Sequence, residues 1–304
     1  MLHNYIKIAF RNLLKYKSNT LISIAGLCLA FASSILILLF VMDELQYDDF
    51  HLNKERIFRV GTDMVDIKTG AINGKIETNG WPVGALLEKE YPEVEAMTYV
   101  RNASNLVAMH EGHRFEQRVF FAGKSFLRIF SFPMVSGNPD EALAGPNKVV
   151  LSRSMAEKFF PHQDAIGKEL MFADSLLFQV SGVMEDVPVR SHMQFDMLVS
   201  FETYERLNTE FDYSDGWGNL DVRNYILLKE GADKVSFFVK ARNLYTDRIK
   251  KELEKYGMYL YLSFEPLNTL YLDTERGNGM GPVGNRNRKQ NLDARKGCLV
   301  CSVS

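Results

Sequence analysis

The hydrophobic and polar positions along this chain follow three different patterns in succession. In the first, residues 2–16, apolar side chains recur at helical spacing, while Lys7, Arg11 and Lys15 lie four apart on another face. A basic amphipathic helix of this kind is typical of a segment that lies on the inner surface of a membrane, and it equally fits a helix packed on a protein partner. The apolar set comprises Leu2, Ile6, Phe10, Leu13 and Leu14.

The second pattern is the uncharged run from Leu21 to Met42. As a helix it would span roughly 33 Å, which is enough to cross a hydrocarbon core of about 30 Å. Serines at 23, 33 and 34 are compatible with this environment, because a helical serine can donate to a carbonyl one turn back. The run therefore predicts a membrane-spanning helix over residues 18–42.

A stripe of small residues, Gly26, Ala30 and Ser34, recurs every four positions within this run. Small side chains on one face allow a second membrane helix to approach closely. Such a stripe also arises by chance in a run that is rich in small residues, so both interpretations remain open.

The charges on either side of the run predict its orientation. Lysine and arginine are in excess on the cytoplasmic side of membrane helices, so the N-terminal residues 1–17 are expected inside and the chain after Asp43 outside. A cleaved signal peptide ending at Ala32 is excluded because the apolar run continues ten residues further. The flanking charges are Lys7, Arg11, Lys15 and Lys17 before the run, and Asp43, Glu44, Asp48 and Asp49 after it.

The third pattern begins at Arg56 and alternates short strands with short helices. Strands are expected at 56–67, 94–109, 115–121, 168–172 and 178–183. Helices are expected after Pro82, over 125–130, and from an N-cap at Ser152. Turns are expected at 68–70 and 110–113.

The last third carries the clearest element order. A strand at 223–229 is followed by a long amphipathic helix from Gly231 to about Tyr256, a C-cap at Gly257 and a strand at 259–265. This order predicts a βα-crossover. The expected buried set of the helix is Val235, Phe238, Val239, Leu244 and Ile249.

Together these elements predict an α+β fold, built as a two-lobed α/β domain after a single N-terminal membrane helix. Residues 103–190 are richer in strands than their flanks, which predicts an inserted β-rich lobe. Residues 277–304 have no apolar period and several basic residues, so this tail is expected to be disordered.

The composition narrows the function classes. The chain has 304 residues, of which 46% are hydrophobic, and a net charge of −2, so nothing in its charge favours nucleic acid as a partner. Between Asp43 and Gly297 there is no cysteine. A domain exported to an oxidising compartment without cysteine must be stabilised by its hydrophobic core and not by disulfides.

Several short motifs resemble known sites but lack the required context. Gly279, Gly281 and Gly284 match a dinucleotide fingerprint, yet no helix follows, and no P-loop occurs in the chain. His110 and His113 lack the i, i+4 spacing of a helical zinc site, so a polar hairpin turn is expected. Cys298 and Cys301 have zinc-ribbon spacing without a second ligand pair.

Two further clusters are expected to be structural. Asp212, Asp215 and Asp221 surround Trp217, but they lack the spacing of a known calcium loop and are expected in a turn packed by an aromatic ring. No nucleophile–base set stands out, so the sequence predicts no catalytic, metal-binding or cofactor-binding residues and no enzyme activity. An apolar cluster, Phe126, Phe130, Phe132 and Met134, is expected in the core and not in a substrate groove.

An ordered set of segments carries a resemblance to a known family. The chain resembles the N-terminal half of bacterial ABC transporter permeases of the MacB/FtsX-like family, over residues 1 to about 285. The segments are NYIKIAFRNLLKYK, FVMDELQYDDFH, FLRIFSFPMVSGNP, KVVLSRSMAEKFF, AIGKEL, VSGVMEDVP, SHMQFDMLVS, YILLKEGAD and GPVGN.

The resemblance implies a membrane-anchored periplasmic core domain over residues 43–276, with a porter-like lobe formed by its two ends and a second lobe inserted at about 103–190. It implies a location in the bacterial inner membrane. It also implies a separate cytoplasmic ABC ATPase as partner, contact with membrane lipid, and, as further partners, a second copy of the chain and a periplasmic adaptor.

The chain departs from the family pattern after GPVGN, where the family continues into further membrane helices and this sequence continues into a polar tail. We therefore expect a truncation or a frameshift past Asn285. The leading interpretation is a permease subunit, or its fragment, that transmits the motion of an ATPase across the membrane. The alternative is a single-pass sensory or adaptor ectodomain that binds a ligand or a protein partner.

Overall fold

The computed structural model divides into two compact units, Met1–Tyr47 and Asp48–Ser304, and each is described by itself. The predicted disordered tail, the glycine motif and the two C-terminal cysteines lie outside the described residues, as do Asp212 and Asp215. The structure describes residues 2–44, 46–103, 108–110, 113–115, 117–172, 176–207 and 216–271.

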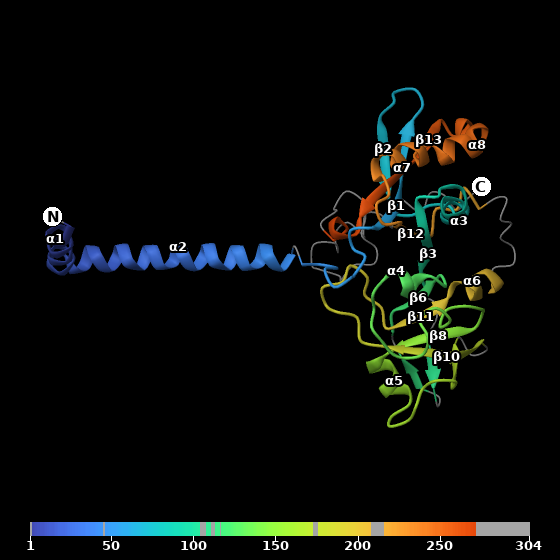
Figure 1. Cartoon of the computed structure of the whole chain (residues 1–304), viewed down its shortest axis with the longest axis horizontal. Helices are drawn as coiled ribbons and strands as arrows, with labels where there is room; N and C mark the ends of the chain where they lie inside the picture. The colour runs from blue at the N-terminus through green and yellow to red at the C-terminus, as the bar shows by residue number, and fades with distance from the viewer. Residues whose placement is uncertain are drawn as a thin grey trace. The chain divides into compact units, whose positions relative to one another are not determined.

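The N-terminal unit consists of α1 (Leu2–Lys15) and α2 (Lys17–Glu44), which confirms both predicted helices (Figure 1). No residue of α2 is buried within the structure, and it is the one described helix that is long and apolar enough to cross a membrane. Ser33 and Ser34 donate their hydroxyls to the Leu29 and Ala30 carbonyls, each at 2.8 Å. Two of the serines thus satisfy their polarity inside the helix, as expected.

The second unit is built on one mixed sheet, which confirms the α+β class. Its hydrogen-bonded order is β13-β1-β12-β3-β6-β11-β8-β10-β9-β4-β5, with β2 paired to β1 and β7 paired to β10. The strands are β1 (Ile57–Asp66), β2 (Ile72–Ile76), β3 (Val94–Asn102), β4 (Ala108–His110), β5 (His113–Phe115), β6 (Val119–Ala122), β7 (Met134–Ser136), β8 (Lys148–Ser152), β9 (Glu169–Phe172), β10 (Leu176–Met184), β11 (Met197–Ser200), β12 (Arg223–Leu228) and β13 (Met258–Pro266).

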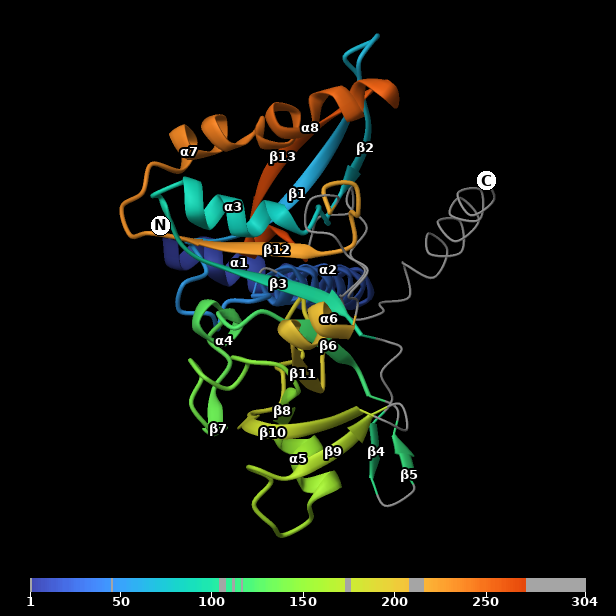
Figure 2. The ribbon, with the colours of Figure 1, turned by 90° about the vertical axis from the view of Figure 1, so that its right-hand side faces the viewer.

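Short helices connect and cover these strands (Figure 2). The predicted cap at Ser152 is confirmed, because its hydroxyl accepts from the backbone N–H of Met155 at the start of α5. Asp233 caps α7 in the same way through the N–H of Ser236. The helices are α3 (Pro82–Glu90), α4 (Phe126–Ile129), α5 (Arg153–Phe159), α6 (Phe201–Leu207), α7 (Lys234–Ala241), α8 (Leu244–Lys255) and the 3-10 turn η1 (Leu267–Thr269).

The strand order separates the ends of the core from its middle. Strands from the two ends of the core sequence, β13, β1, β12 and β3, are neighbours, and strands from residues 108–200 form the other half of the sheet. The halves meet at the antiparallel pairing of β3 with β6, where Val100 faces Ala122. Because both halves lie in one compact unit, the division into two lobes stays a prediction.

The predicted βα-crossover is confirmed. β12 and β13 are each antiparallel to β1, which lies between them, so they run parallel to one another. Residues 234–255 connect them through α7 and α8, and Figure 2 shows these helices beside the β13–β1–β12 half of the sheet. Gly257 has φ +68°, as its predicted C-cap role requires.

The long helix predicted from Gly231 to Tyr256 is wrong in two respects. It is two helices, with a break at Arg242 and Asn243, and the carbonyl of Arg242 accepts from the N–H of Leu262 on the edge strand β13. The buried face is also different. Of the predicted buried set, Leu244 is buried and Phe238 and Ile249 are partly buried, but Val235 and Val239 are 73% and 69% exposed. Phe237, Ala241 and Tyr245 form the rest of the buried face.

Two strand predictions also need correction. The first part of β1 does not alternate between buried and exposed positions, because both of its faces are covered: Ile57 packs in one hydrophobic cluster and Phe58 and Val60 in another, and even Arg59 is buried. The strand expected at 115–121 is split between β5, which pairs with β4 as a hairpin, and β6, which pairs with β3 and β11. The flanking residues therefore serve two different parts of the sheet.

Candidate functional site

The candidate motifs of the sequence do not assemble into a site within the described residues. His110 and His113 face each other across the β4–β5 hairpin, which agrees with the predicted turn. Asp221 forms an ion pair with Arg101, at 2.8 Å from its Nε, and Trp217 packs edge-on against Tyr245. These are structural contacts of the kind expected for this region.

The phenylalanine cluster lies in the core, as predicted. Phe126, Phe130 and Phe132 are buried in one hydrophobic cluster, and Met134 packs against it from a partly buried position. Phe130 contacts Tyr225 with ring centroids 5.1 Å apart in an edge-on arrangement. This cluster forms the apolar wall of a polar network that the sequence analysis missed.

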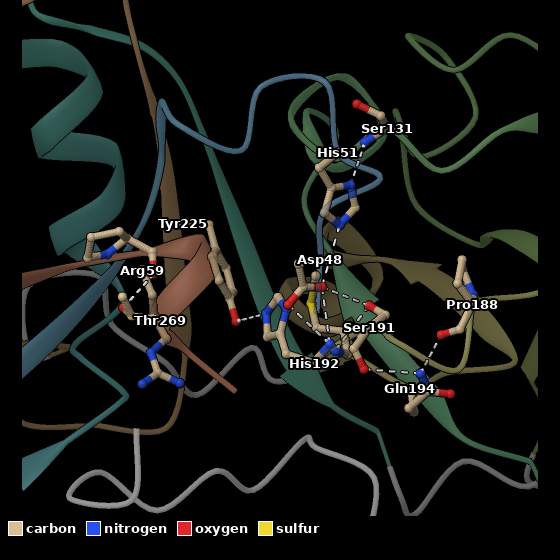
Figure 3. Close-up of polar contacts among 12 residues, drawn as sticks. Asp48, His51, Arg59, Ser131, Pro188, Ser191, His192, Gln194, Tyr225 and Thr269 are labelled. Carbon is tan, nitrogen blue, oxygen red and sulfur yellow. Dashed lines mark hydrogen bonds and ion pairs between the residues drawn. The ribbon is translucent and has the colours of Figure 1, made fainter. Parts of the chain in front are cut away.

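The missed network, which we call the junction network, consists of Asp48, His51, His192 and Tyr225 (Figure 3). Its residues come from the start of the core unit, from the segment before β11, and from the middle of β12. All four are almost completely buried. Asp48 adopts φ +58°, a left-handed conformation that aspartate tolerates better than most residues.

Asp48 is the acceptor at the centre of the network. His192 donates to its carboxylate twice, from Nδ1 to Oδ2 at 2.8 Å and from its backbone N–H to Oδ1 at 3.1 Å. The Ser191 hydroxyl donates to Oδ1 at 3.2 Å. Burial alone would raise the pKa of Asp48, but the charge and hydrogen bonds of His192 bring that pKa below its ordinary value, so the carboxylate is ionised.

His51 occupies the opposite side of Asp48. Its Nδ1 accepts from the backbone N–H of Ser131 at 3.1 Å, so its proton lies on Nε2, which is 3.8 Å from Asp48 Oδ1. The imidazole packs edge-on against Phe132, at 5.0 Å between centroids. Burial lowers the pKa of His51 to about 3 despite the nearby carboxylate, so the ring is neutral.

Tyr225 completes the network on the sheet. Its hydroxyl lies 3.1 Å from His192 Nε2, the ring nitrogen opposite the Nδ1 that donates to Asp48. An acid, an imidazole and a hydroxyl in line resemble a nucleophilic triad. However, burial raises the pKa of Tyr225, and all four residues are buried. The geometry therefore indicates a network that holds segments of the core together.

A second buried cluster, the ion-pair cluster, crosses the adjacent strands. Arg59 Nη1 lies 2.9 Å from Glu77 Oε2, and Arg59 Nη2 lies 2.6 Å from Glu265 Oε2. Arg223 pairs with the other oxygen of Glu77. Burial by itself would lower the pKa of Arg59, but Tyr225, Glu265 and Glu77 raise it, so the guanidinium keeps its charge.

The junction network fixes the first residues of the core to its central sheet. The Asp48 N–H donates to the Arg190 carbonyl at 2.9 Å, and the Leu52 N–H donates to Ser131 Oγ at 3.0 Å. Three segments that are distant in sequence therefore meet there. They are parts of FVMDELQYDDFH, FLRIFSFPMVSGNP and SHMQFDMLVS, three of the segments that carried the family resemblance.

Comparison with known proteins gives a consistent picture. The MacB-like periplasmic core domain family matches residues 20–253, which is more than two thirds of the chain. Among curated protein sequences, none matches. A solved domain of a protein described as a permease, from Porphyromonas gingivalis, is 25% identical, with a TM-score of 0.60, and the match covers 71% of this chain and 91% of that one.

Two other solved structures are more distant. The periplasmic region of MacB from Actinobacillus actinomycetemcomitans is 12% identical, with a TM-score of 0.46 and coverage of 66% of this chain and 87% of that one. The extracellular domain of the ABC-type transporter YknZ from Gram-positive bacteria is 13% identical, with a TM-score of 0.45 and coverage of 67% and 99%.

An apolar helix followed by a periplasmic-type domain is the arrangement of a membrane-anchored protein with an extracytoplasmic domain. On the strength of the match over residues 20–253, the chain belongs to the MacB-like periplasmic core domain family.

Proposed function

We propose that this chain acts as a permease subunit of an ABC transporter, which passes the motion of a separate cytoplasmic ATPase to an extracytoplasmic core. The observation that carries this proposal is the family match, which runs from within the apolar helix at residue 20 to α8 at residue 253. The anchor and the core are thus matched together. The charges that flank the apolar run support a cytoplasmic N-terminus and a periplasmic core.

The junction network supplies a physical route for such motion. Only residues 45–47 separate the end of α2 from Asp48, and Asp48 is hydrogen-bonded to the segment before β11 and, through His192, to β12. A short connection passes on a displacement that a long flexible linker would absorb. In this proposal the core responds mechanically and does no covalent chemistry.

We further propose that residues 103–190 move as a lobe against the half of the sheet that is formed by β13, β1, β12 and β3. The two halves share the β3–β6 pairing, which has three residue pairs, whereas β1 and β13 share nine. A short pairing is the expected place for bending between two packed parts of one sheet.

The orientation is tested by cysteine labelling in spheroplasts. In a background with Cys28, Cys298 and Cys301 replaced by serine, a cysteine at Asp49 should react with a membrane-impermeant maleimide, and a cysteine at Lys15 should react only after permeabilisation. Labelling at Lys15 alone would contradict the proposed orientation.

The partner is tested by photo-crosslinking in the native host. A crosslinking residue in place of Arg11, on α1, should capture a protein that carries the G-x-x-x-x-G-K-[ST] signature of an ATPase, while the same residue in place of Asp49 should not. Mass spectrometry identifies the captured protein. Absence of such an ATPase from the Arg11 product would favour the sensory or adaptor alternative.

A further inference from the structure

Two aliphatic side chains at the start of the core are almost fully exposed. Leu52 is 89% exposed and Val189 is 82% exposed. Both lie on segments that are tied to the residues directly after α2. Leu52 donates its N–H to Ser131 Oγ, and Val189 precedes Arg190, whose carbonyl accepts from the Asp48 N–H.

Both side chains are exposed although hydrogen bonds hold their loops in place. The Val189 loop is held by the Gln194 amide, which donates to the Pro188 carbonyl at 2.8 Å and to the Ser191 carbonyl at 3.1 Å. Leu52 follows directly after the buried His51. Single exposed aliphatic residues are common on protein surfaces. These two differ in that hydrogen bonds hold both of their loops next to the residues that follow α2, and burying each side chain would gain roughly 1.5–3 kcal/mol.

The length of the connection restricts what can bury these side chains. Within the described residues, α2 ends at Glu44, two residues after the apolar run ends at Met42, so α2 itself adds no stalk beyond the apolar run. Four residues in extended conformation reach at most about 14 Å, which places Asp48 close to the outer lipid headgroups. The loops that are bonded to Asp48 and follow it are then held near the same layer.

We propose that Leu52 and Val189 insert into the headgroup region of the outer leaflet, so that the core is seated on the membrane at this face. Both side chains then lie at the boundary between the headgroups and the acyl chains, where apolar residues of peripheral proteins bind about 5–10 Å deep. This inference rests on the proposed anchoring of α2. The seating would restrict how the core turns relative to its anchor.

Ile72 offers a matched aliphatic control. It is exposed on β2, where it pairs with Val65 of β1. Ile57, at the other end of β1, is hydrogen-bonded through its N–H to Asn53, the residue next to Leu52. Eight residues of strand separate Val65 from Ile57, so Ile72 lies roughly 26 Å further along the strand than the Leu52 loop.

The test uses the full chain in vesicles of phosphatidylethanolamine and phosphatidylglycerol. Single cysteines at Leu39, Leu52, Ile72 or Val189, in the cysteine-free background, carry an environment-sensitive fluorophore, and a fraction of the lipid carries a nitroxide near the headgroup. Fluorescence at Leu52 and Val189 should fall about twofold when the nitroxide lipid is present, because both lie within the ~5–10 Å interfacial layer, and that at Ile72 should stay unchanged.

The label at Leu39 separates the two levels of the inference. Quenching at Leu39 without quenching at Leu52 and Val189 would overturn the seating while leaving the anchoring intact. Loss of quenching at Leu39 as well would overturn the anchoring on which the seating rests. Equal quenching at Ile72 would mean that the core has no defined membrane face. If the fluorophores at Leu52 and Val189 report an apolar environment but the nitroxide lipid does not quench them, this face contacts a protein. Either result would overturn the proposal.

Discussion

The junction network and the ion-pair cluster are both buried polar groups, and both include a residue of β12, but they are built differently. The junction network has one carboxylate, Asp48, which accepts from Ser191 and from the backbone and side chain of His192. The ion-pair cluster has two arginines and two glutamates, and its bonds run between side chains. One fixes loops to a strand, and the other fixes strands to each other.

The difference determines how each responds to its surroundings. A guanidinium keeps its proton throughout the accessible pH range, so the ion-pair cluster is permanently charged on its basic side. The junction network depends on imidazoles, whose ordinary pKa lies near the physiological range. The stability of the segment that follows the anchor in sequence is therefore the part that depends on pH, and four variants test this comparison.

The largest effect is expected from Arg59→Met. Removing the guanidinium leaves the Glu265 carboxylate in a largely buried position without the charge it faces, and breaking a buried pair in this way costs about 3–5 kcal/mol. Trp81 is buried in one hydrophobic cluster and Trp217 packs against another, so the fluorescence of these two tryptophans during denaturation of the full chain in detergent reports this stability.

The matched control is Arg118→Met. Arg118 pairs with Asp196 at 2.7 Å, but its side chain is half exposed, and a surface pair of this kind contributes about 1 kcal/mol or less. A double variant, Arg59→Met with Glu265→Gln, should recover part of the loss because the carboxylate that faced Arg59 is now neutral. Equal losses at Arg59 and Arg118 would show that burial does not make the ion-pair cluster contribute more than an exposed ion pair.

The sequence predicted most elements of this fold but not its polar core. The apolar run, the cap at Ser152 and the crossover around β1 are local signals, which depend on spacing within a few residues. The long helix was misassigned because Val235, Phe238 and Val239 form a stronger apolar stripe than Phe237 and Ala241. The tertiary contact with β13 decided which stripe is buried.

The junction network could not be derived from spacing, because Asp48 and His192 are 144 positions apart. In the sequence, Asp48 after the anchor and His192 before a strand each have the pattern expected of exposed residues. The available signal was indirect: both lie in segments that carried the family resemblance, which marks them as residues of interest without indicating their contact. Histidine residues that a sequence scan treats as scattered can thus be neighbours in the core.

The second largest effect is expected from Asp48→Asn. Asparagine keeps the shape and tolerates the left-handed φ of +58°, so the change removes mainly the charge that accepts three hydrogen bonds. The loss should be about 2–3 kcal/mol in the free energy of unfolding. Asp49→Asn, at an exposed neighbour paired with Lys54, should change it by less than about 0.5 kcal/mol. A loss at Asp49 that matches the loss at Asp48 would sink the assignment of the junction network.

A smaller effect is expected from Tyr225→Phe. The ring and its edge-on contact with Phe130 remain, while His192 Nε2 loses its hydrogen bond with the phenolic hydroxyl. Leaving one buried polar atom unsatisfied should cost about 1–2 kcal/mol. Tyr256→Phe, at an exposed tyrosine, is the control and should have no measurable effect. A neutral result at Tyr225 would mean that water replaces the hydroxyl and that β12 is not fastened through it.

The smallest effect separates the two clusters by pH. The pKa of His51 is about 3 in the fold, against an ordinary value of 6.5, so between these values the unfolded chain binds a proton that the folded chain does not. The free energy of unfolding therefore falls as the pH drops below about 6.5, by roughly 1 kcal/mol between pH 7.5 and 5.5. The Asp48 carboxylate, with its lowered pKa, adds to this loss only at lower pH.

His51→Asn removes this proton while its amide oxygen can still accept from the Ser131 N–H, as Nδ1 does in the native chain. The variant should lose less stability than the wild type between pH 7.5 and 5.5, by about 1 kcal/mol, because its unfolded state no longer takes up the proton. His162→Asn, at a fully solvated histidine, should keep the wild-type profile. Parallel pH profiles for His51→Asn and the wild type would show that His51 is protonated in the fold, and the contrast between a titratable junction and a permanently charged sheet would then fail.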